Sequence, residues 1–188
     1  MLAEFQITLP AQTTATADPK GKTLLENTQA TLGFIPNMYA NMVNSPGLLE
    51  AYLTGYTSFR NDSGFTPPEQ EVVFLTISRD NGCEYCVSAH SFLADMKSGL
   101  APDVTDAIRN GAPIADAKLA ALAEFTSVVS GTRGLPSKAA TEAFLTAGYS
   151  QRQILEIVLA LAVKTISNYS NHLFHTTLDP VFEGRRWS

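Results

Sequence analysis

Both cysteines of the chain, Cys83 and Cys86, lie in one short stretch with His90, one of only three histidines. Good helix formers follow from Glu84 to Gly99, so we expect both cysteines in the first turn of a helix, three residues apart and on the same face. Sulfur atoms at that spacing can form a disulfide. The N–H groups at a helix start favour a thiolate, and such surroundings lower a thiol pKa from about 8.5 to about 3.5–7.5. The spacing therefore indicates a redox site.

A carboxylate, Glu71, precedes Cys83 by twelve residues. It falls in an expected amphipathic helix over Pro67–Arg79, for which Thr66 is the capping residue. If this helix and the cysteine helix pack as an antiparallel pair, Glu71 comes to lie beside His90. A carboxylate there can orient the imidazole, which gives a proton relay Glu71–His90–Cys86. The alternative is a surface glutamate that only stabilises its own helix start.

The full pattern, E-x11-C-x2-C-x3-H, resembles that of the AhpD-like alkylhydroperoxidases of the carboxymuconolactone decarboxylase superfamily. Further stretches share the resemblance, which covers roughly residues 20–183: Leu32–Met38 and Ser45-Pro46 upstream, and Gln153–Glu156 with Asn168 and Asn171 downstream. The resemblance implies an AhpD-like helical bundle, a homo-oligomer (trimer or hexamer) and a lipoyl-type electron donor. One position departs from it: Tyr85 stands between the cysteines where the best-studied members have a second histidine.

The expected function is a thiol-dependent peroxidase that reduces alkyl hydroperoxides through a dithiol–disulfide cycle. Cys86, closer to His90, is the expected attacking thiolate and becomes a sulfenic acid. Cys83, nearer the helix start and expected to be the more exposed, condenses with it to a disulfide, which a small dithiol or a dithiol protein then reduces. His90 and Glu71 handle the proton, and Tyr85 is a possible relay or pocket residue. No cofactor is needed.

Several other functions remain open. The same dithiol would serve a general thiol–disulfide oxidoreductase or a redox-stress chaperone. Cys83, Cys86, His90 and Glu71 could instead be four metal ligands, although one CxxC without a second Cys/His pair is thin support for zinc. Lactone decarboxylation is less favoured, because family members with that chemistry lack the paired cysteines. The cysteines could also be incidental to a structural or binding module.

Composition and patterning predict one all-α domain. The chain has 188 residues, 45% of them hydrophobic, and a net charge of −5, which disfavours nucleic-acid and anionic-membrane partners. Residues 1–20 are expected to be an extended arm and residues 21–188 a single helical domain. The stretch MLAEFQITLP lacks the features of a signal peptide, so a cytoplasmic protein is expected.

Helical periodicity accounts for most of the chain, and no convincing alternating strand occurs. Helices are expected over about 21–32, 37–44, 46–60, 67–79, 84–98, 102–110, 114–130, 138–147 and 151–175, the last with a break near Ser167. A shift of 84 residues superimposes the Thr66 and Ser150 caps, which suggests a duplicated helical hairpin. His172 and His175 are expected near a helix end rather than in the pocket, and Trp187 is expected to bury against a partner chain.

Overall fold

Capping residues identified in the sequence do start helices in the computed structural model, which describes residues 2–188. Thr66 and Ser150 each form a capping box with the residue three positions on. Ser137 also accepts a hydrogen bond from a backbone N–H group in the first turn of the helix that follows it. Gly33, Gly99 and Gly111 end their helices in the left-handed conformation that glycine adopts without strain.

The part of the chain described by the structure contains nine α-helices, a π-turn, a short 3-10 helix and no strand. The elements are α1 (Pro19–Leu32), α2 (Asn37–Met42), α3 (Pro46–Asp62), α4 (Pro67–Asp80), α5 (Glu84–Leu93), η1 (Ala94–Ser98), α6 (Pro102–Asn110), α7 (Ala117–Gly131), α8 (Lys138–Thr146), α9 (Gln151–Phe174) and η2 (Pro180–Arg185). The predicted all-α class is therefore confirmed.

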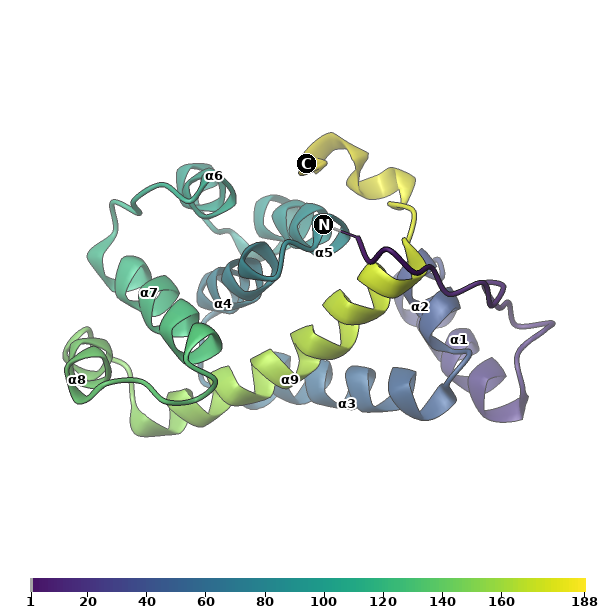
Figure 1. Ribbon diagram of the computed structural model, residues 1–188, viewed down its shortest axis with the longest axis horizontal. Coiled ribbons are helices and arrows are strands. Elements are labelled where there is room, and N and C mark those ends of the chain that lie inside the picture. Colours follow the sequence, from purple (N-terminus) through teal and green to yellow (C-terminus); the bar gives the residue numbers. More distant parts are fainter. Residues whose placement is uncertain (1) are drawn as a thin grey trace.

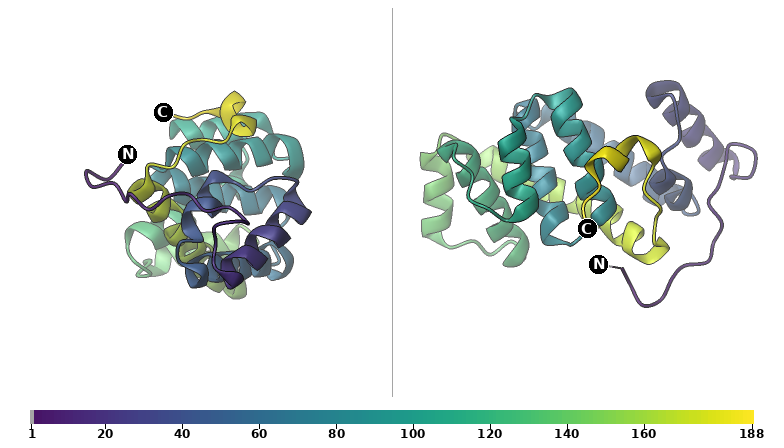
Figure 2. Two further views of the ribbon diagram at one scale, coloured as in Figure 1. Left: turned by 90° about the vertical axis from the view of Figure 1, so that its right-hand side faces the viewer. Right: turned by 90° about the horizontal axis from the view of Figure 1, so that it is seen from above.

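Helix α4 lies at the centre of the molecule, where α5, α6, α7 and α9 all pack against it (Figure 1). Every residue from Glu69 to Ser78 is buried, the polar ones included, so this helix is enclosed on all sides and the amphipathic helix expected from the sequence is wrong. Helices α7 and α8 form one end of the elongated molecule, and α1 and α2 form the other (Figure 2).

The longest helix, α9, crosses the molecule and packs lengthwise on α3 (Figure 1). Gly55 lies at the close approach of these two helices, because a Cβ atom there would come within 2.8 Å of Val163 Cγ2. The break predicted near Ser167 is wrong, since α9 is continuous from Gln151 to Phe174. The second hairpin suggested by the shift of 84 residues is consequently absent. The residues that correspond to α4, the turn and α5 form one continuous helix, α9.

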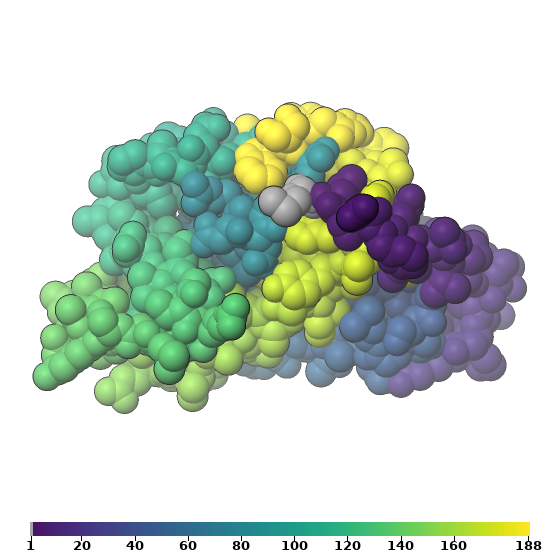
Figure 3. Space-filling view, in the orientation of Figure 1, coloured from purple at the N-terminus to yellow at the C-terminus, as the bar shows by residue number. Residues whose placement is uncertain are grey.

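Both ends of the described chain pack against the rest of it. The N-terminal segment before α1 crosses the end of α9, where the Ala3 N–H donates to the His172 carbonyl at 3.2 Å and the Ile7 N–H donates to the Leu173 carbonyl at 2.9 Å (Figure 3). At the other end, Trp187 Nε1 donates to the Arg109 carbonyl at 3.0 Å. Trp187 is thus partly buried on α6 of its own chain, and its contact with a partner chain stays a prediction.

Candidate active site

The turn between α4 and α5 fixes the position of both cysteines. Gly82 has a positive φ of 64°, and the Cys83 N–H donates to the Ser78 carbonyl at 2.9 Å, which closes the turn. Cys83 has extended dihedrals and is the N-cap of α5, whereas Cys86 lies inside the first turn. The prediction that both lie within the helix is thus off by one residue for Cys83, because the turn ends there.

The two thiols are neighbours and both are buried. Cys83 is 0% exposed and Cys86 is 2% exposed, so the prediction that Cys83 is the more exposed is wrong. Neither is in a disulfide. The Asn171 Nδ2 group of α9 points at both, at 3.3 Å from the Cys86 sulfur and 3.9 Å from the Cys83 sulfur. Ser167, one turn earlier on α9, lies 3.9 Å from the Cys86 sulfur.

These surroundings shift the pKa values of the two thiols in opposite directions. Burial alone would raise the pKa of Cys86, but a hydrogen bond from the Cys83 thiol and the positive charge of Lys164 lower that pKa well below its ordinary value. The same hydrogen bond, together with burial, raises the pKa of Cys83 well above its ordinary value. These opposite shifts favour Cys86 as the thiolate of the reduced pair and Cys83 as the thiol that donates to it.

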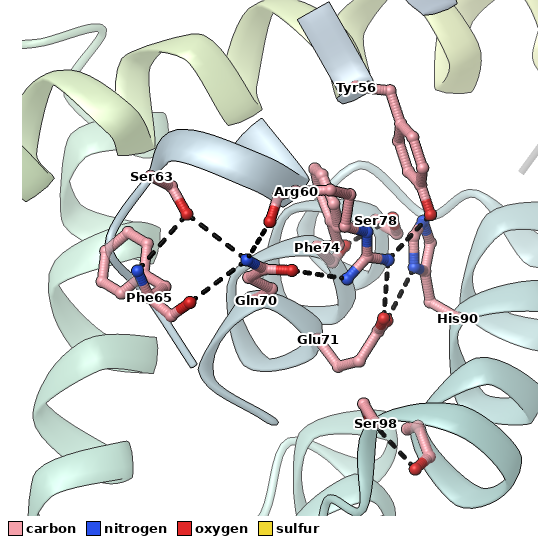
Figure 4. Close-up of polar contacts among 11 residues, drawn as sticks. Tyr56, Arg60, Ser63, Phe65, Gln70, Glu71, Phe74, Ser78, His90 and Ser98 are labelled. Carbon is pink, nitrogen blue, oxygen red and sulfur yellow. Dashed lines mark hydrogen bonds and ion pairs between the residues drawn. The ribbon is translucent and has the colours of Figure 1, made fainter. Parts of the chain in front are cut away.

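Glu71 and His90 meet as predicted, and the structure adds Arg60 to them. His90 Nδ1 lies 2.8 Å from Glu71 Oε2, and Arg60 Nη2 lies 2.6 Å from Glu71 Oε1 (Figure 4). Arg60 also donates to the Tyr56 hydroxyl and to Gln70 Oε1, at 2.8 and 3.1 Å. Glu71 is 2% exposed, so it is not the surface glutamate of the alternative interpretation.

The ionisation of this cluster follows from its contacts. Burial would raise the pKa of Glu71, but His90 and Arg60 together lower it, so the carboxylate is ionised and only accepts hydrogen bonds. Burial, reinforced by the charge of Lys164, lowers the pKa of His90 to about 4. His90 is therefore neutral at pH 7: its Nδ1–H donates to Glu71, and its Nε2 atom has a free lone pair.

Cys86 and His90 open on a cavity of about 430 Å³, a size that suits a small organic molecule. Its other walls are mainly aromatic and apolar: Phe34, Met38, Tyr39, Tyr52, Tyr56, Tyr85, Phe92 and Phe182. A second, smaller cavity of about 140 Å³ reaches Cys83, with His172 and His175 on its walls. The two cysteines thus face different cavities, and the two C-terminal histidines lie closer to the thiols than their sequence position suggested.

Tyr85 contributes a wall to both cavities. Its hydroxyl donates to the carboxylate of Asp179, which also accepts from the Asn37 N–H at 3.2 Å. Burial and that carboxylate raise the pKa of Tyr85. Tyr85 thus lines the pocket with its hydroxyl held by Asp179, and its role as a proton relay stays a prediction.

A metal site is not supported in the described part of the chain. No group of three or more His, Cys, Asp and Glu side chains between residues 2 and 188 is arranged to hold a metal ion. Glu71 is instead bound by Arg60 and His90, which removes it from the four-ligand set considered above. The same residues include no helix long and apolar enough to cross a membrane.

Sequence reasoning did not assign a role in the site to Lys164, Arg60 or Asp179. Lys164 follows the apolar run Ile157–Val163, and an isolated lysine after such a run is the available signal that its side chain points inward. Arg60 carries no comparable signal, because arginine at a helix C-terminus is usually an exposed residue that complements the helix dipole.

Comparisons with known proteins agree with this fold. Residues 46–127 match the model of the Carboxymuconolactone decarboxylase family. The fold over nearly the whole chain is that of the AhpD core: the peroxidase-related protein from Ralstonia eutropha JMP134 superimposes with a TM-score of 0.81 at 22% identity, covering 96% of this chain and 97% of that one. The family model covers residues 46–127, somewhat less than half of the chain, and the solved structure extends the likeness in fold over nearly all of it.

Two other solved structures share the fold. A peroxidase-related protein from Silicibacter sp. TM1040 has a TM-score of 0.78 at 21% identity, covering 98% of this chain and 97% of that one. The debrominase Bmp8, solved with 2,3,4-tribromopyrrole, has a TM-score of 0.75 at 16% identity, covering 97% and 96%. No curated protein sequence matches the chain.

Proposed function

We propose that this protein is a thiol peroxidase that reduces organic hydroperoxides through Cys86 and Cys83. The observation that carries the proposal is the pairing of a thiolate with a neighbouring thiol at the wall of an organic-sized cavity. A dithiol in which only one sulfur is ionised is suited to a reaction with two different steps, attack and then condensation.

In the first step the Cys86 thiolate attacks the distal oxygen of the hydroperoxide. The O–O bond breaks, the sulfur is oxidised to a sulfenic acid, and the rest of the substrate leaves as an alkoxide that must take up a proton. In the second step the Cys83 sulfur displaces the hydroxyl group of that sulfenic acid. Its thiol proton leaves with the hydroxyl as water, and the disulfide forms.

His90 acts as a neutral base that restores the Cys86 thiolate needed for the first step. When reduction of the disulfide returns Cys86 as a thiol, Nε2 of His90 can accept the thiol proton, and Glu71 holds the ring in the required tautomer. Arg60 keeps Glu71 ionised and in place. This gives Glu71 a positioning role, in which it acts through His90 rather than on the substrate.

A second candidate is reductive dehalogenation of a halogenated aromatic molecule, which the aromatic walls of the larger cavity favour. Bmp8, a debrominase of the same fold, was solved with a tribrominated pyrrole. The thiolate would take bromine from carbon, the carbon would take a proton, and Cys83 would displace bromide to give the same disulfide. General disulfide reduction and chaperone activity would use the same cysteines. Comparing the rate of disulfide reduction with the rate of peroxide reduction distinguishes them from peroxidase activity.

The reductant and the assembly belong to the same proposal. A dithiol donor of the lipoyl type would attack the disulfide at Cys83, through the smaller cavity that this residue lines.

A homo-oligomer is in keeping with the exposed apolar side chains Leu155, Val158, Tyr169 and Leu173 along α9. Light scattering coupled to size-exclusion chromatography measures the assembly, and a monomer would contradict that part.

The test is peroxide consumption with dihydrolipoamide as reductant in the wild type, Cys86→Ser and Cys83→Ser. We expect no turnover in Cys86→Ser, and in Cys83→Ser a single oxidation that stops at a sulfenic acid, which dimedone traps. Equal turnover of Cys83→Ser and wild type would rule out the two-cysteine cycle. A wild type that reduces insulin disulfides or 2,3,4-tribromopyrrole faster than cumene hydroperoxide would favour one of the other activities.

A further inference from the structure

Lys164 of α9 is fully buried, with an exposed fraction of 0%. Its ammonium group has no hydrogen-bond partner among the described residues. Burying an ammonium group without a partner is so unfavourable that lysine is almost never found in this state in proteins. Such a side chain indicates either a counter-charge that appears during function or a ligand that supplies one.

The Lys164 side chain lies at the reacting end of the larger cavity. It lines that cavity together with Cys86 and His90. Its Nζ atom lies 5.5 Å from the centre of the Phe74 ring, and that ring centre lies 4.9 Å from the centre of the His90 ring. The contact with Phe74 offers a weak cation–π attraction, which does not replace a counter-ion.

Two lysines line the larger cavity, but Lys97 of η1 is exposed to solvent and Lys164 is fully buried, so Lys164 is the buried cation of the site. Arg60 is balanced by its ion pair with Glu71. His90 carries no charge above about pH 4. The remaining titratable groups that face Cys86 from the surrounding elements are neutral at pH 7 when the pair is reduced: Tyr39 of α2, Tyr52 of α3, Cys83 and Tyr85 of α5, and His172 of α9. The thiolate of Cys86 is then the negative charge available to Lys164.

We propose that Lys164 is the cation of this active site: it balances the Cys86 thiolate before the reaction and the leaving oxygen of the hydroperoxide after it. This inference rests on the proposed peroxidase function. It follows from where the charge goes, because the negative charge leaves sulfur for the proximal oxygen as the O–O bond breaks, while the buried ammonium stays in place. A fixed cation that serves both positions needs no rearrangement during the step.

Lys164 also gives up and recovers the proton that the cycle requires. The alkoxide takes a proton from the Lys164 ammonium and leaves as the alcohol, so the disulfide form holds a neutral amine in place of a buried, uncompensated charge. A dithiol that reduces the disulfide delivers two hydrogens with its two electrons. One stays on Cys83 as a thiol, and the other passes from the Cys86 thiol by way of His90 Nε2 to Lys164, which leaves Cys86 as a thiolate again.

The test uses Lys164→Met, which keeps the length of the side chain and removes its charge, with Lys138→Met as the control. Lys138 is an exposed lysine of α8, far from the thiols in sequence and fold. The first readout is the pH dependence of Cys86 alkylation by iodoacetamide in single-turnover conditions. We expect the alkylation profile of Lys164→Met to move to higher pH by about one unit or more, so that below the pKa of Cys86 the variant alkylates about tenfold more slowly, because one pKa unit there removes about nine-tenths of the thiolate.

The second readout separates the leaving oxygen from the thiolate. Loss of thiolate slows every peroxide by the same factor, so the ratio of rates for two peroxides at one pH reports on the leaving group alone. tert-Butyl hydroperoxide releases a strongly basic alkoxide, and peracetic acid releases a weakly basic carboxylate. We expect Lys164→Met to slow tert-butyl hydroperoxide about 10²–10³-fold, and about tenfold more than peracetic acid, as for loss of one oxyanion-stabilising group.

Equal slowing of the two peroxides, with an unchanged alkylation profile, would overturn the proposal. If Lys164→Met does not fold, judged by circular dichroism, Lys164→Gln takes its place. In addition, thiolate absorbance at 240 nm must then show Cys86 ionising at a lower pH in the Cys83→Ser protein than in the Cys83→Ser/Lys164→Gln protein, and equal values contradict the role. A wild type that ignores peroxides while Lys164→Met still shifts the alkylation profile would refute the peroxidase and retain Lys164 as the thiolate counter-ion.

Discussion

Replacing Glu71 by glutamine tests the buried cluster that holds His90. The substitution keeps the shape of the side chain but removes the charge that balances Arg60 and accepts from His90 Nδ1, at 2.6 and 2.8 Å. Arg60 would then remain largely buried, with 20% of its side chain exposed and no carboxylate beside it. The expected result is a loss of both stability and activity.

The size of the stability loss follows from this burial. Breaking a buried ion pair by removing one partner costs about 3–5 kcal/mol. Arg60 keeps some exposure and its hydrogen bonds to Tyr56 and Gln70, so the lower end applies, about 3 kcal/mol. For a chain of this length that corresponds to a fall in Tm of roughly 6–12 °C. Loss of an oriented base lowers the peroxidase rate by about 10²-fold or more.

Urea denaturation of wild type, Glu71→Gln, Arg60→Met and the double variant measures the stability. We expect the double variant to be more stable than the sum of the single losses predicts, by about 1–3 kcal/mol, because it leaves no unpaired charge. Since the pKa of Glu71 in the folded protein is below its ordinary value of 4.5, the stabilisation is present above pH 4.5 and is lost as the pH falls. Additive losses, or a single loss under about 1 kcal/mol, would refute the reasoning.

The remaining predictions concern His90, Asn171 and the contact between α3 and α9. Burial lowers the pKa of His90 to about 4 in the folded protein, so the unfolded chain takes up the proton first as the pH falls. Neutral His90 therefore contributes ~3 kcal/mol to the free energy of unfolding above pH 6.5, and this contribution is lost towards pH 4. Urea denaturation of His90→Gln should show a flatter dependence of stability on pH. Asn171→Leu removes the donor at 3.3 Å from the Cys86 sulfur and should raise the pKa of Cys86 by about 1–2, measured by thiolate absorbance. Gly55→Ala should destabilise by ~1–3 kcal/mol through the clash with Val163, whereas Gly47→Ala, with open space around it, should be neutral or stabilising in the same thermal melts.

The fold class could be predicted because each helix carries its own signals. Capping residues such as Thr66 and Ser150 and stop residues such as Gly99 act locally, so the sequence alone places most boundaries to within a few residues. The break predicted in α9 failed because Ser167 and Ser170 satisfy their hydroxyls by bonding to carbonyls of the preceding turn, which leaves the helix intact.

The site was partly predictable for a similar reason. Cys83, Cys86 and His90 are close in sequence, so their proximity follows from helical geometry, and Glu71 needed only the packing of two consecutive helices. The exposure of the thiols was not predictable in this way, because Asn171 and Lys164 come from a helix more than seventy residues later. Side chains that long-range packing brings together leave no local pattern in the sequence.

Cys83 and Cys86 are proposed to act as a pair in which one peroxide makes one disulfide. The measurement is a titration of the fully reduced protein with cumene hydroperoxide, followed by intact mass and peptide mapping without reductant. One equivalent should remove two hydrogens per chain and link the peptides containing Cys83 and Cys86. A protein that instead gains oxygen at Cys86 without forming the link, or that remains fully reduced, would contradict the account.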